Sequence, residues 1–139
     1  MSSEEANVAK LKEAYGRWSE TRGEIPDVFL DLVDPEVNFG SIPRGEAPLT
    51  FAKAYKGREA LREYFVGLNG GWTMVHYAMD DYVAQGEYVV ARGSCAWTNK
   101  QTGKIAETPK VDFWRFKDGK AIEFYEYFDT AHVAAAASA

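Results

Sequence analysis

The stretch Phe113–Asp129, FWRFKDGKAIEFYEYFD, decides the fold that this sequence predicts. Two runs rich in aromatic and β-branched residues flank the dipeptide Asp118-Gly119. Such runs are typical of strands, and Asp-Gly is typical of a tight hairpin turn. Because side chains alternate between the two faces of a strand, Phe124, Glu126 and Phe128 share one face. The stretch therefore predicts an antiparallel hairpin with one largely apolar face.

The length of the turn decides which residue shares a face with Glu126. A two-residue turn would place Asp112 with Tyr125, whereas a three-residue loop, Lys117–Gly119 with Gly119 left-handed in a bulge, would place Asp112 with Glu126. We prefer the three-residue loop because it gathers five apolar side chains on one face of the hairpin. These are Trp114, Phe116, Ile122, Phe124 and Phe128.

With this register, the carboxyl groups of Asp112 and Glu126 lie together in an apolar concavity. Burying two acids is costly unless they serve a purpose. Desolvation and mutual repulsion favour keeping at least one of them neutral. A neutral acid can donate a hydrogen bond to a developing enolate oxygen while an ionised neighbour removes a carbon-bound proton. The structural alternatives are that Asp112 pairs with Arg92 or Lys110, and that Glu126 is satisfied by a neighbouring Tyr, Arg or backbone group.

In the second half of the chain the hydrophobic residues recur with the period of strands, and in the first half they recur with the period of helices. Turn residues at Gln85-Gly86 and Asn99–Gly103 separate the earlier strands. The predicted strands are Trp72–Val83, Glu87–Thr98, Ile105–Phe116 and Ala121–Phe128.

Three helices are predicted before these strands. Ser2 and Glu5 have the spacing of a capping box, and a helix with one apolar face follows and ends near Gly23. Its apolar positions are Val8, Leu11, Tyr15 and Trp18. A second helix is expected between Pro26 and Pro35, with Val28, Phe29, Leu32 and Val33 buried. A third runs from Gly57 to Asn69-Gly70-Gly71, with a short strand at 37–42 and a loop at 43–56 before it.

Helices followed by an antiparallel meander indicate the α+β class. We expect one domain, residues 3–133, and an alanine-rich tail, 134–139, that is either a short terminal helix or frayed. Asp129 is expected to cap that helix.

Composition narrows the range of functions. The 139-residue chain is 14% aromatic, which suggests an aromatic-lined cavity, a buried subunit interface, or both. A net charge of −5 with no basic run argues against nucleic acid as a partner. One cysteine and two histidines indicate no metal site. The acidic N-terminus has no signal-peptide pattern and no apolar run has membrane length, so we expect a cytoplasmic protein. No cofactor is expected.

The order of elements resembles the SnoaL-like and ketosteroid isomerase-like branches of the nuclear transport factor 2-like superfamily. The resemblance rests on GREALREYF, residues 57–65, and on FWRFKDGKAIEFYEYFD, which is also similar to the last hairpin of limonene epoxide hydrolases. It implies a cone-shaped fold in which three N-terminal helices pack on a curved antiparallel sheet that encloses a pocket.

The resemblance also implies roles for individual residues. Asp112 and Tyr15 match the oxyanion-binding Asp and Tyr of ketosteroid isomerases, but the isomerases' base position is occupied here by Phe39. Glu126 falls where SnoaL-like cyclases and limonene epoxide hydrolases carry a catalytic Asp. The epoxide hydrolases' Arg and second Asp fall near Gly93 and Cys95, so the chain departs from that set.

These residues favour an enzyme that abstracts a proton next to the carbonyl of a small lipophilic compound, for isomerisation or aldol-type cyclisation. Glu126 would be the base, and Asp112 with Tyr15 would stabilise the oxyanion. His76 is a further candidate proton carrier, which with Tyr15 would suit a dehydratase. The expected ligand-binding side chains are Trp18, Phe39, Trp114, Phe116, Phe124 and Phe128.

The alternative from another class is a non-catalytic dimeric module that binds a small hydrophobic ligand, which Phe39 in the base position favours. The opposite face of the hairpin is also apolar, and we expect a homodimer to form through it. That face carries Val111, Phe113, Tyr125 and Tyr127.

Overall fold

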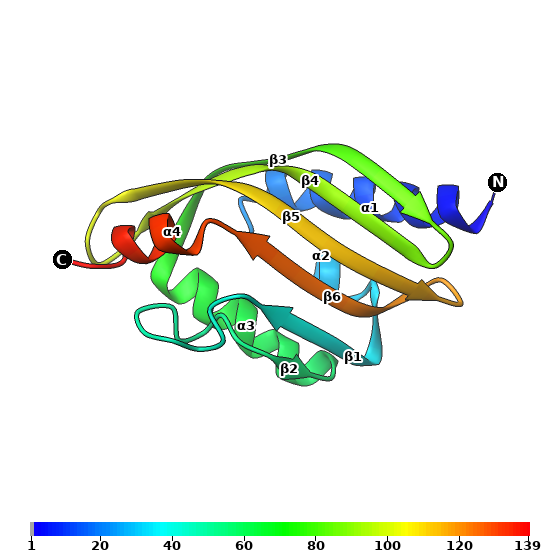
Figure 1. Ribbon diagram of the computed structural model, residues 1–139, viewed down its shortest axis with the longest axis horizontal. Helices are drawn as coiled ribbons and strands as arrows, with labels where there is room; N and C mark the ends of the chain where they lie inside the picture. The colour runs from blue at the N-terminus through cyan, green and yellow to red at the C-terminus, as the bar shows by residue number, and fades with distance from the viewer. Residues whose placement is uncertain (1) are drawn as a thin grey trace.

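The computed structural model describes residues 2–139, and its elements follow the predicted order (Figure 1). Four helices are present in this part of the chain: α1 (Ser3–Glu20), α2 (Asp27–Leu30), α3 (Arg58–Gly71) and α4 (Thr130–Ala136). The six strands are β1 (Val33–Ser41), β2 (Tyr55–Lys56), β3 (Trp72–Gln85), β4 (Tyr88–Asn99), β5 (Ile105–Lys117) and β6 (Lys120–Phe128). The predicted α+β class is confirmed.

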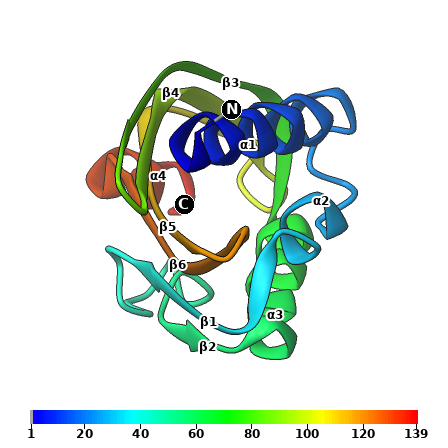
Figure 2. The same ribbon diagram turned by 90° about the vertical axis from the view of Figure 1, so that its right-hand side faces the viewer.

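All six strands form one sheet in the order β2-β1-β6-β5-β4-β3. Neighbouring strands are antiparallel except for β1 and β6, which run parallel. In end view the sheet curves around helices α1, α2 and α3, which lie on its concave side (Figure 2). The predicted cone-shaped arrangement is therefore confirmed, with one parallel pairing that the sequence pattern did not indicate.

Helix α1 begins and packs as its sequence predicts. The Ser2 hydroxyl accepts a hydrogen bond from the Glu5 backbone N–H at 3.1 Å, which satisfies one of the free donors of the first turn. Leu11, Tyr15 and Trp18 are all buried against the sheet. This helix places two aromatic side chains close to the interior of the cone.

The second helix is shorter than predicted. It ends at Leu30, and the chain is already extended at Val33, so Pro35 lies within β1 rather than at a helix end. The residue before a proline avoids helical backbone angles, and Asp34 lies in the extended backbone of β1. The β1–β6 register accordingly shifts between Val33 and Asn38.

The β5–β6 hairpin has the predicted register but reaches it by a different route. The turn contains two residues, Asp118 and Gly119, both with positive φ (51° and 82°), and Lys117 pairs with Lys120. A bulge between Ala121 and Glu123 then supplies the extra residue, which is Ile122. The predicted three-residue loop was wrong, and Ala121, not Ile122, occupies the buried position opposite Phe116.

Helix α4 packs against β5 at the end of the sheet. The Asp129 carboxylate caps it by accepting a hydrogen bond from the His132 N–H at 3.1 Å. The Thr102 hydroxyl donates to the Ala136 carbonyl at 2.5 Å, and Ala136 is buried. The predicted tail thus begins inside an ordered terminal helix, the first of the two alternatives.

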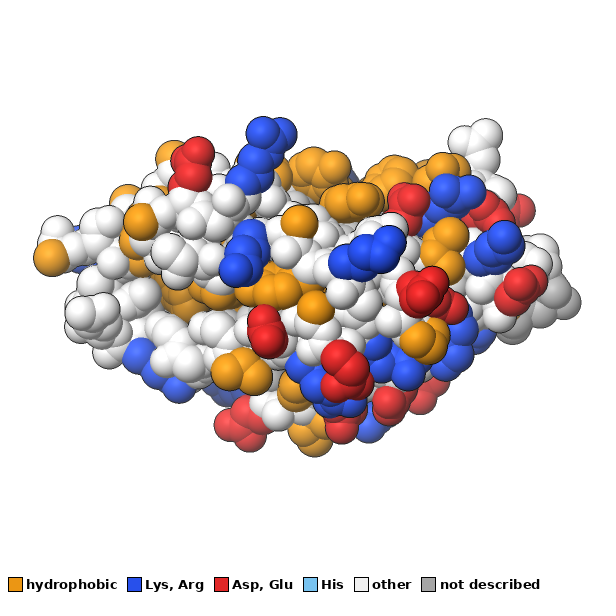
Figure 3. Space-filling model, turned by 90° about the horizontal axis from the view of Figure 1, so that it is seen from below, with side chains coloured by type: hydrophobic (Ala, Val, Ile, Leu, Met, Phe, Trp, Pro, Cys, Tyr) orange, Lys and Arg blue, Asp and Glu red, His pale blue; other side chains and the backbone are white. Residues whose placement is uncertain are grey.

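The surface seen from the side of β1 and β2 is unevenly charged (Figure 3). Lys, Arg, Asp and Glu side chains gather over one half of this face, and hydrophobic side chains show near its centre. Within residues 2–139, no helix has both the length and the apolar character required to cross a membrane.

Candidate functional site

A cavity lies inside the cone, between the sheet and helices α1 and α3. Its atom-free volume is about 660 Å³ with its opening to solvent included, so the enclosed part is smaller. Most of its wall is aromatic, and three charged side chains, Lys110, Asp112 and Glu126, line it. The other lining residues are Trp18, Phe29, Phe51, Tyr64, Phe65, Leu68, Trp72, Tyr77, Cys95, Trp97, Ala106, Thr108, Phe124, Phe128 and Val133.

The hairpin register brings the three charged groups together. Asp112 and Glu126 are direct partners across β5 and β6, and Lys110 precedes Asp112 by two residues on the same face. The Lys110 ammonium lies 2.5 Å from Asp112 Oδ1 and 3.3 Å from Glu126 Oε1. Their side chains are only 8%, 1% and 3% exposed, so the cluster is shielded from water.

Asp112 is held by two tyrosines as well as by the lysine. The Tyr15 hydroxyl donates to Asp112 Oδ2 at 2.5 Å, and the Tyr77 hydroxyl lies 3.5 Å from the same oxygen. Tyr15 in turn accepts a hydrogen bond from Trp114 Nε1 at 2.9 Å. The chain Trp114–Tyr15–Asp112 therefore ties this carboxylate to helix α1 and to its own strand.

Glu126 is held by hydroxyl groups from two other elements. Ser41, at the end of β1, donates to Oε2 at 2.6 Å, and Tyr64, on α3, donates to Oε1 at 2.7 Å. The parallel pairing of β1 with β6 makes Ser41 the direct partner of Glu126. The polar partners of the two carboxylates are thus hydroxyl groups and the Lys110 ammonium.

The pKa shifts of the neighbours agree with this arrangement. Burial lowers the pKa of Lys110, but attraction to Asp112 and Glu126 outweighs burial and raises that pKa well above its ordinary value. Burial, reinforced by the negative charge of the nearby carboxylate, raises the pKa of Tyr15, Tyr64 and Tyr77 well above theirs. The lysine is therefore an ammonium and the three phenols are neutral donors.

Lys110 places a positive charge beside the two acids that the sequence predicted to share the cavity. The prediction that one acid is neutral rested on two buried carboxyl groups with no compensating charge nearby, and it stays a prediction. The alternative pairing of Asp112 with Lys110 is realised, whereas Arg92 pairs with Asp81 on the surface.

The structure brings Tyr15, Asp112 and Glu126 together but excludes His76. The His76 side chain is 43% exposed and lies 3.7 Å from Glu107 in a surface ion pair. Because the chain alternates along β3, His76 points away from the face that carries Tyr77. Its predicted role as a proton carrier in the cavity is therefore wrong.

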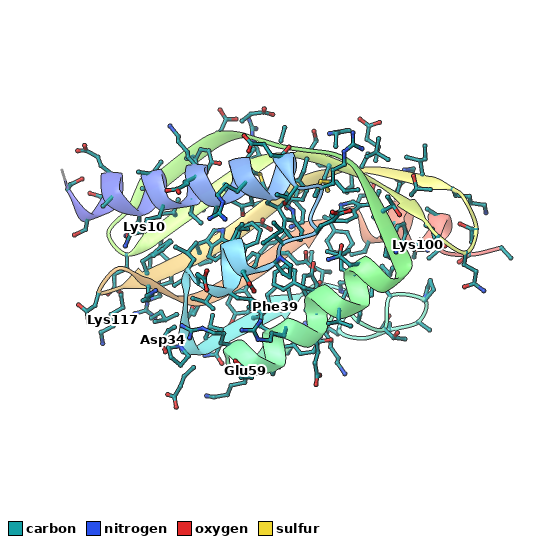
Figure 4. All side chains as sticks on the ribbon, turned by 180° about the vertical axis from the view of Figure 1, so that it is seen from behind. Lys10, Asp34, Phe39, Glu59, Lys100 and Lys117 are labelled. Atoms are coloured by element: carbon teal, nitrogen blue, oxygen red, sulfur yellow. The ribbon has the colours of Figure 1, made fainter. Side chains whose placement is uncertain are left out.

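Of the six aromatic side chains predicted to bind the ligand, three line the cavity and three do not. Trp18, Phe124 and Phe128 line the cavity. Phe39 does not, because it is buried between β1 and α3, with its ring centroid 4.5 Å from that of Tyr64 (Figure 4). The remaining two, Trp114 and Phe116, are fully buried core residues beneath the cavity wall.

From the sequence, Lys110 was expected only as a possible ion-pair partner of Asp112, not as a functional residue. Its signal was present, since a lysine two residues from an inward-facing aspartate shares the inward face of the strand. Tyr64 and Ser41 had no comparable signal, because their positions depend on how α3 and β1 pack against β6.

Cys95 lies in the cavity wall and is almost fully buried. Burial raises the pKa of its thiol from 9.0 to about 11, although Lys110 opposes this shift. A neutral thiol is a weak nucleophile, so Cys95 contributes packing rather than reactivity at neutral pH. No group of three or more His, Cys, Asp or Glu side chains suited to a metal ion occurs in the described part of the chain.

Comparison with known proteins identifies the family. The SnoaL-like domain model matches residues 13–124, which is most of the chain. The chain belongs to the SnoaL-like domain family. No curated protein sequence matches it.

Solved structures agree on the fold of this SnoaL-like domain. An NTF2-like protein of unknown function from Burkholderia pseudomallei is 24% identical, with a TM-score of 0.82 over 100% of both chains. TerC, co-crystallised with polyporic acid, is 21% identical, with a TM-score of 0.78 over 96% of this chain and 99% of its own. A candidate SnoaL-like polyketide cyclase from Mesorhizobium loti is 17% identical, with a TM-score of 0.72 over 91% of this chain and 99% of its own. The fold is thus that of NTF2-like proteins.

Proposed function

We propose that this SnoaL-like domain is an enzyme that removes a proton next to the carbonyl group of a small lipophilic compound. The observation that carries the proposal is the Lys110 ammonium held between two buried carboxylates in the wall of an aromatic cavity. Such a site offers a base and a positive hydrogen-bond donor to the same ligand. An enolate forms when the base takes the proton, and the donor stabilises the oxygen on which charge develops.

Lys110 is the group that we assign to the oxyanion. An ammonium has three N–H donors; Lys110 donates one of them to Asp112, and Glu126 Oε1 lies 3.3 Å away as an ion-pair partner. N–H donors therefore remain for a ligand oxygen. Tyr15 cannot supply that bond as the sequence predicted, because its one O–H donates to Asp112. Tyr15 is therefore a positioning residue that holds Asp112.

Glu126 is the carboxylate that we assign as the base. Its contact with Lys110 is 3.3 Å, whereas the contact of Asp112 is 2.5 Å. The longer contact leaves Glu126 less closely paired with the ammonium, while the closer contact of Asp112 holds the ammonium in place. Each acid thus has a separate task in the same cluster.

The fate of the enolate decides the reaction class. If Glu126 returns the proton to another carbon, the product is an isomer. If the enolate carbon attacks a second carbonyl of the same molecule, a ring closes, and the Glu126 proton passes to the new alkoxide. Family neighbours described as isomerases and SnoaL-like polyketide cyclases support either outcome.

The test is exchange of the α-protons of 2-tetralone, a flat enolisable ketone, in deuterated buffer followed by NMR. The wild-type protein should accelerate exchange, and Glu126→Gln should slow it by about 100-fold or more. The matched control is Glu123→Gln, on the same strand but facing Arg115 on the outer surface, which should exchange as the wild type does. Equal exchange by wild type and Glu126→Gln would contradict the proposal.

A non-catalytic binding module is the second candidate function. It is favoured by Phe39, which fills the isomerases' base position and packs in the core against Tyr64 rather than facing the cavity. If the chain is such a module, 2-tetralone or 2-naphthol should bind, and the α-protons of 2-tetralone should not exchange. Loss of exchange but not of binding in Glu126→Gln would rule it out.

We also propose that a second copy of the chain covers the outer face of β5 and β6. Tyr127 is 47% exposed there, and the half-buried Val111, Phe113 and Tyr125 lie beside it. Sedimentation of the wild type as a dimer and of Tyr127→Lys as a monomer would support this, and a monomeric wild type would refute it.

A further inference from the structure

The charge of the cavity cluster does not balance. One ammonium, Lys110, faces two carboxylates, Asp112 and Glu126, and these are the charged side chains among the lining residues. Their formal charges therefore sum to +1 − 2 = −1. The phenols of Tyr64 and Tyr77 are neutral and add nothing. One negative charge is thus left over in a site that is shielded from water.

We propose that this leftover charge makes the cavity select its ligand by charge, accepting an uncharged compound that carries a hydroxyl or enol group and excluding carboxylates. The inference rests on the cavity of the proposed function but does not depend on turnover. The cluster would repel an additional negative charge a few ångströms away, and solvent would screen this repulsion only weakly. An uncharged ligand meets no such repulsion.

The free hydrogen-bonding positions indicate which uncharged groups fit. Glu126 accepts hydrogen bonds from Ser41 and Tyr64 and lies 3.3 Å from the Lys110 ammonium, and a carboxylate can accept about four hydrogen bonds, so acceptor capacity remains. Lys110 donates one hydrogen bond, to Asp112, and keeps N–H donors for a ligand. A single hydroxyl or enol group satisfies both, because its oxygen accepts from the ammonium while its hydrogen is donated to the carboxylate. A carboxylate ligand has no hydrogen to donate and leaves the second position unmet.

The test compares two probes of nearly the same shape, 2-naphthalenemethanol and 2-naphthoate, by fluorescence titration at neutral pH. The alcohol should bind the wild type about 100-fold more tightly than the carboxylate, since one unit charge at close range is worth a few kcal/mol in a partly shielded site. Asp112→Asn and Glu126→Gln each bring the cluster to zero charge. In each, the preference for the alcohol should fall by about tenfold or more.

The control is again Glu123→Gln, which removes one negative charge from the outer face of the same strand and should keep the wild-type preference. Two cavity variants are used so that one remains if the other fails to fold. Equal binding of both probes by the wild type, or a preference unchanged in the folded cavity variants, would overturn the inference.

The same titrations separate this inference from the proposed function. Selective binding of the alcohol without exchange of 2-tetralone would remove the enzymatic proposal and leave charge selection standing. Exchange together with equal binding of the two probes would do the reverse. Binding of neither probe would count against both.

Discussion

Asp112 and Glu126 face each other across one hairpin, yet they are held very differently. Asp112 is fixed by the close Lys110 contact and by Tyr15, which is itself fixed by Trp114. Glu126 has a longer contact with Lys110 and two hydroxyl donors from separate elements, β1 and α3. The two acids are thus held in place by different surrounding elements.

Because of this difference, we expect the two acids to contribute unequally to stability and to reactivity. The Asp112 side links a helix, a strand and the ammonium, so changes there should mainly affect folding. The Glu126 side is less tightly paired, so changes there should mainly affect the handling of protons.

Replacing Lys110 with Met should have the largest effect, because it leaves both carboxylates buried without their shared counter-charge. Removal of one partner from a buried ion cluster costs about 3–5 kcal/mol. Urea unfolding followed by circular dichroism measures the change. Lys100→Met, in the exposed β4–β5 turn, is the matched control and should cost far less. A Lys110→Met protein as stable as the control would mean that the cluster carries no compensating charge.

Removal of single phenol hydroxyls should separate the two acids. Tyr15→Phe should cost about 2–3 kcal/mol, because it leaves Asp112 Oδ2 with only the 3.5 Å contact of Tyr77 and the Trp114 N–H without a partner. Tyr64→Phe removes one hydrogen bond to Glu126 and should cost about 1–2 kcal/mol. Paired urea titrations give the two values, and the reverse order would contradict the stronger hold on Asp112.

Cys95 provides a pH-dependent probe of the cavity wall. Burial raises the pKa of its thiol from 9.0 to about 11, so the folded protein keeps a proton that the unfolded chain loses. This contribution to stability is therefore present below pH 9 and is lost as the pH rises towards 11. Between about pH 8 and about pH 10 the wild type should lose roughly 1.3 kcal/mol more than Cys95→Ala. Parallel pH dependences of the two proteins would show that the thiol is not shielded.

Ser41→Ala should have the smallest effect. Glu126 keeps its bonds from Tyr64 and Lys110, so the loss in stability should be about 0.5–1.5 kcal/mol. Exchange of 2-tetralone should slow severalfold, because the carboxylate loses the contact that fixes its second oxygen. A loss of exchange as large as that of Glu126→Gln would make Ser41 part of the chemistry rather than a positioning residue.

Much of this architecture was readable from local sequence, and the failures have physical causes. The helical period around Leu11 and the strand periods after Trp72 are properties of short stretches, and both gave the right elements. The meeting of Asp112 with Glu126 was also predicted, but through the wrong turn, since a bulge at Ile122 is set by packing rather than by turn residues. The end of α2 was missed because Pro35, which was predicted to end the helix, lies within strand β1.

The candidate site was harder to predict than the fold. The inward face of β5 carried the signal for Lys110, but its position between two acids depends on how far its side chain extends across the hairpin. Tyr64 and Ser41 reach Glu126 from α3 and β1, elements that are distant in sequence. His76 was assigned wrongly because a bulge between Met74 and His76 interrupts the alternation of β3, so that Tyr77 rather than His76 points inward.

The measurement that tests the account most directly is ¹³C NMR of the carboxyl groups of Asp112 and Glu126, in protein labelled at its Asp and Glu carboxyl carbons, as 2-naphthol is added. The account predicts that bound naphthol becomes ionised and that the Glu126 carboxyl takes up its proton while Asp112 stays a carboxylate beside Lys110. The Glu126 signal would be assigned by its absence from Glu126→Gln. A proton appearing on Asp112, or naphthol that binds without ionising, would contradict the division of roles between the two acids.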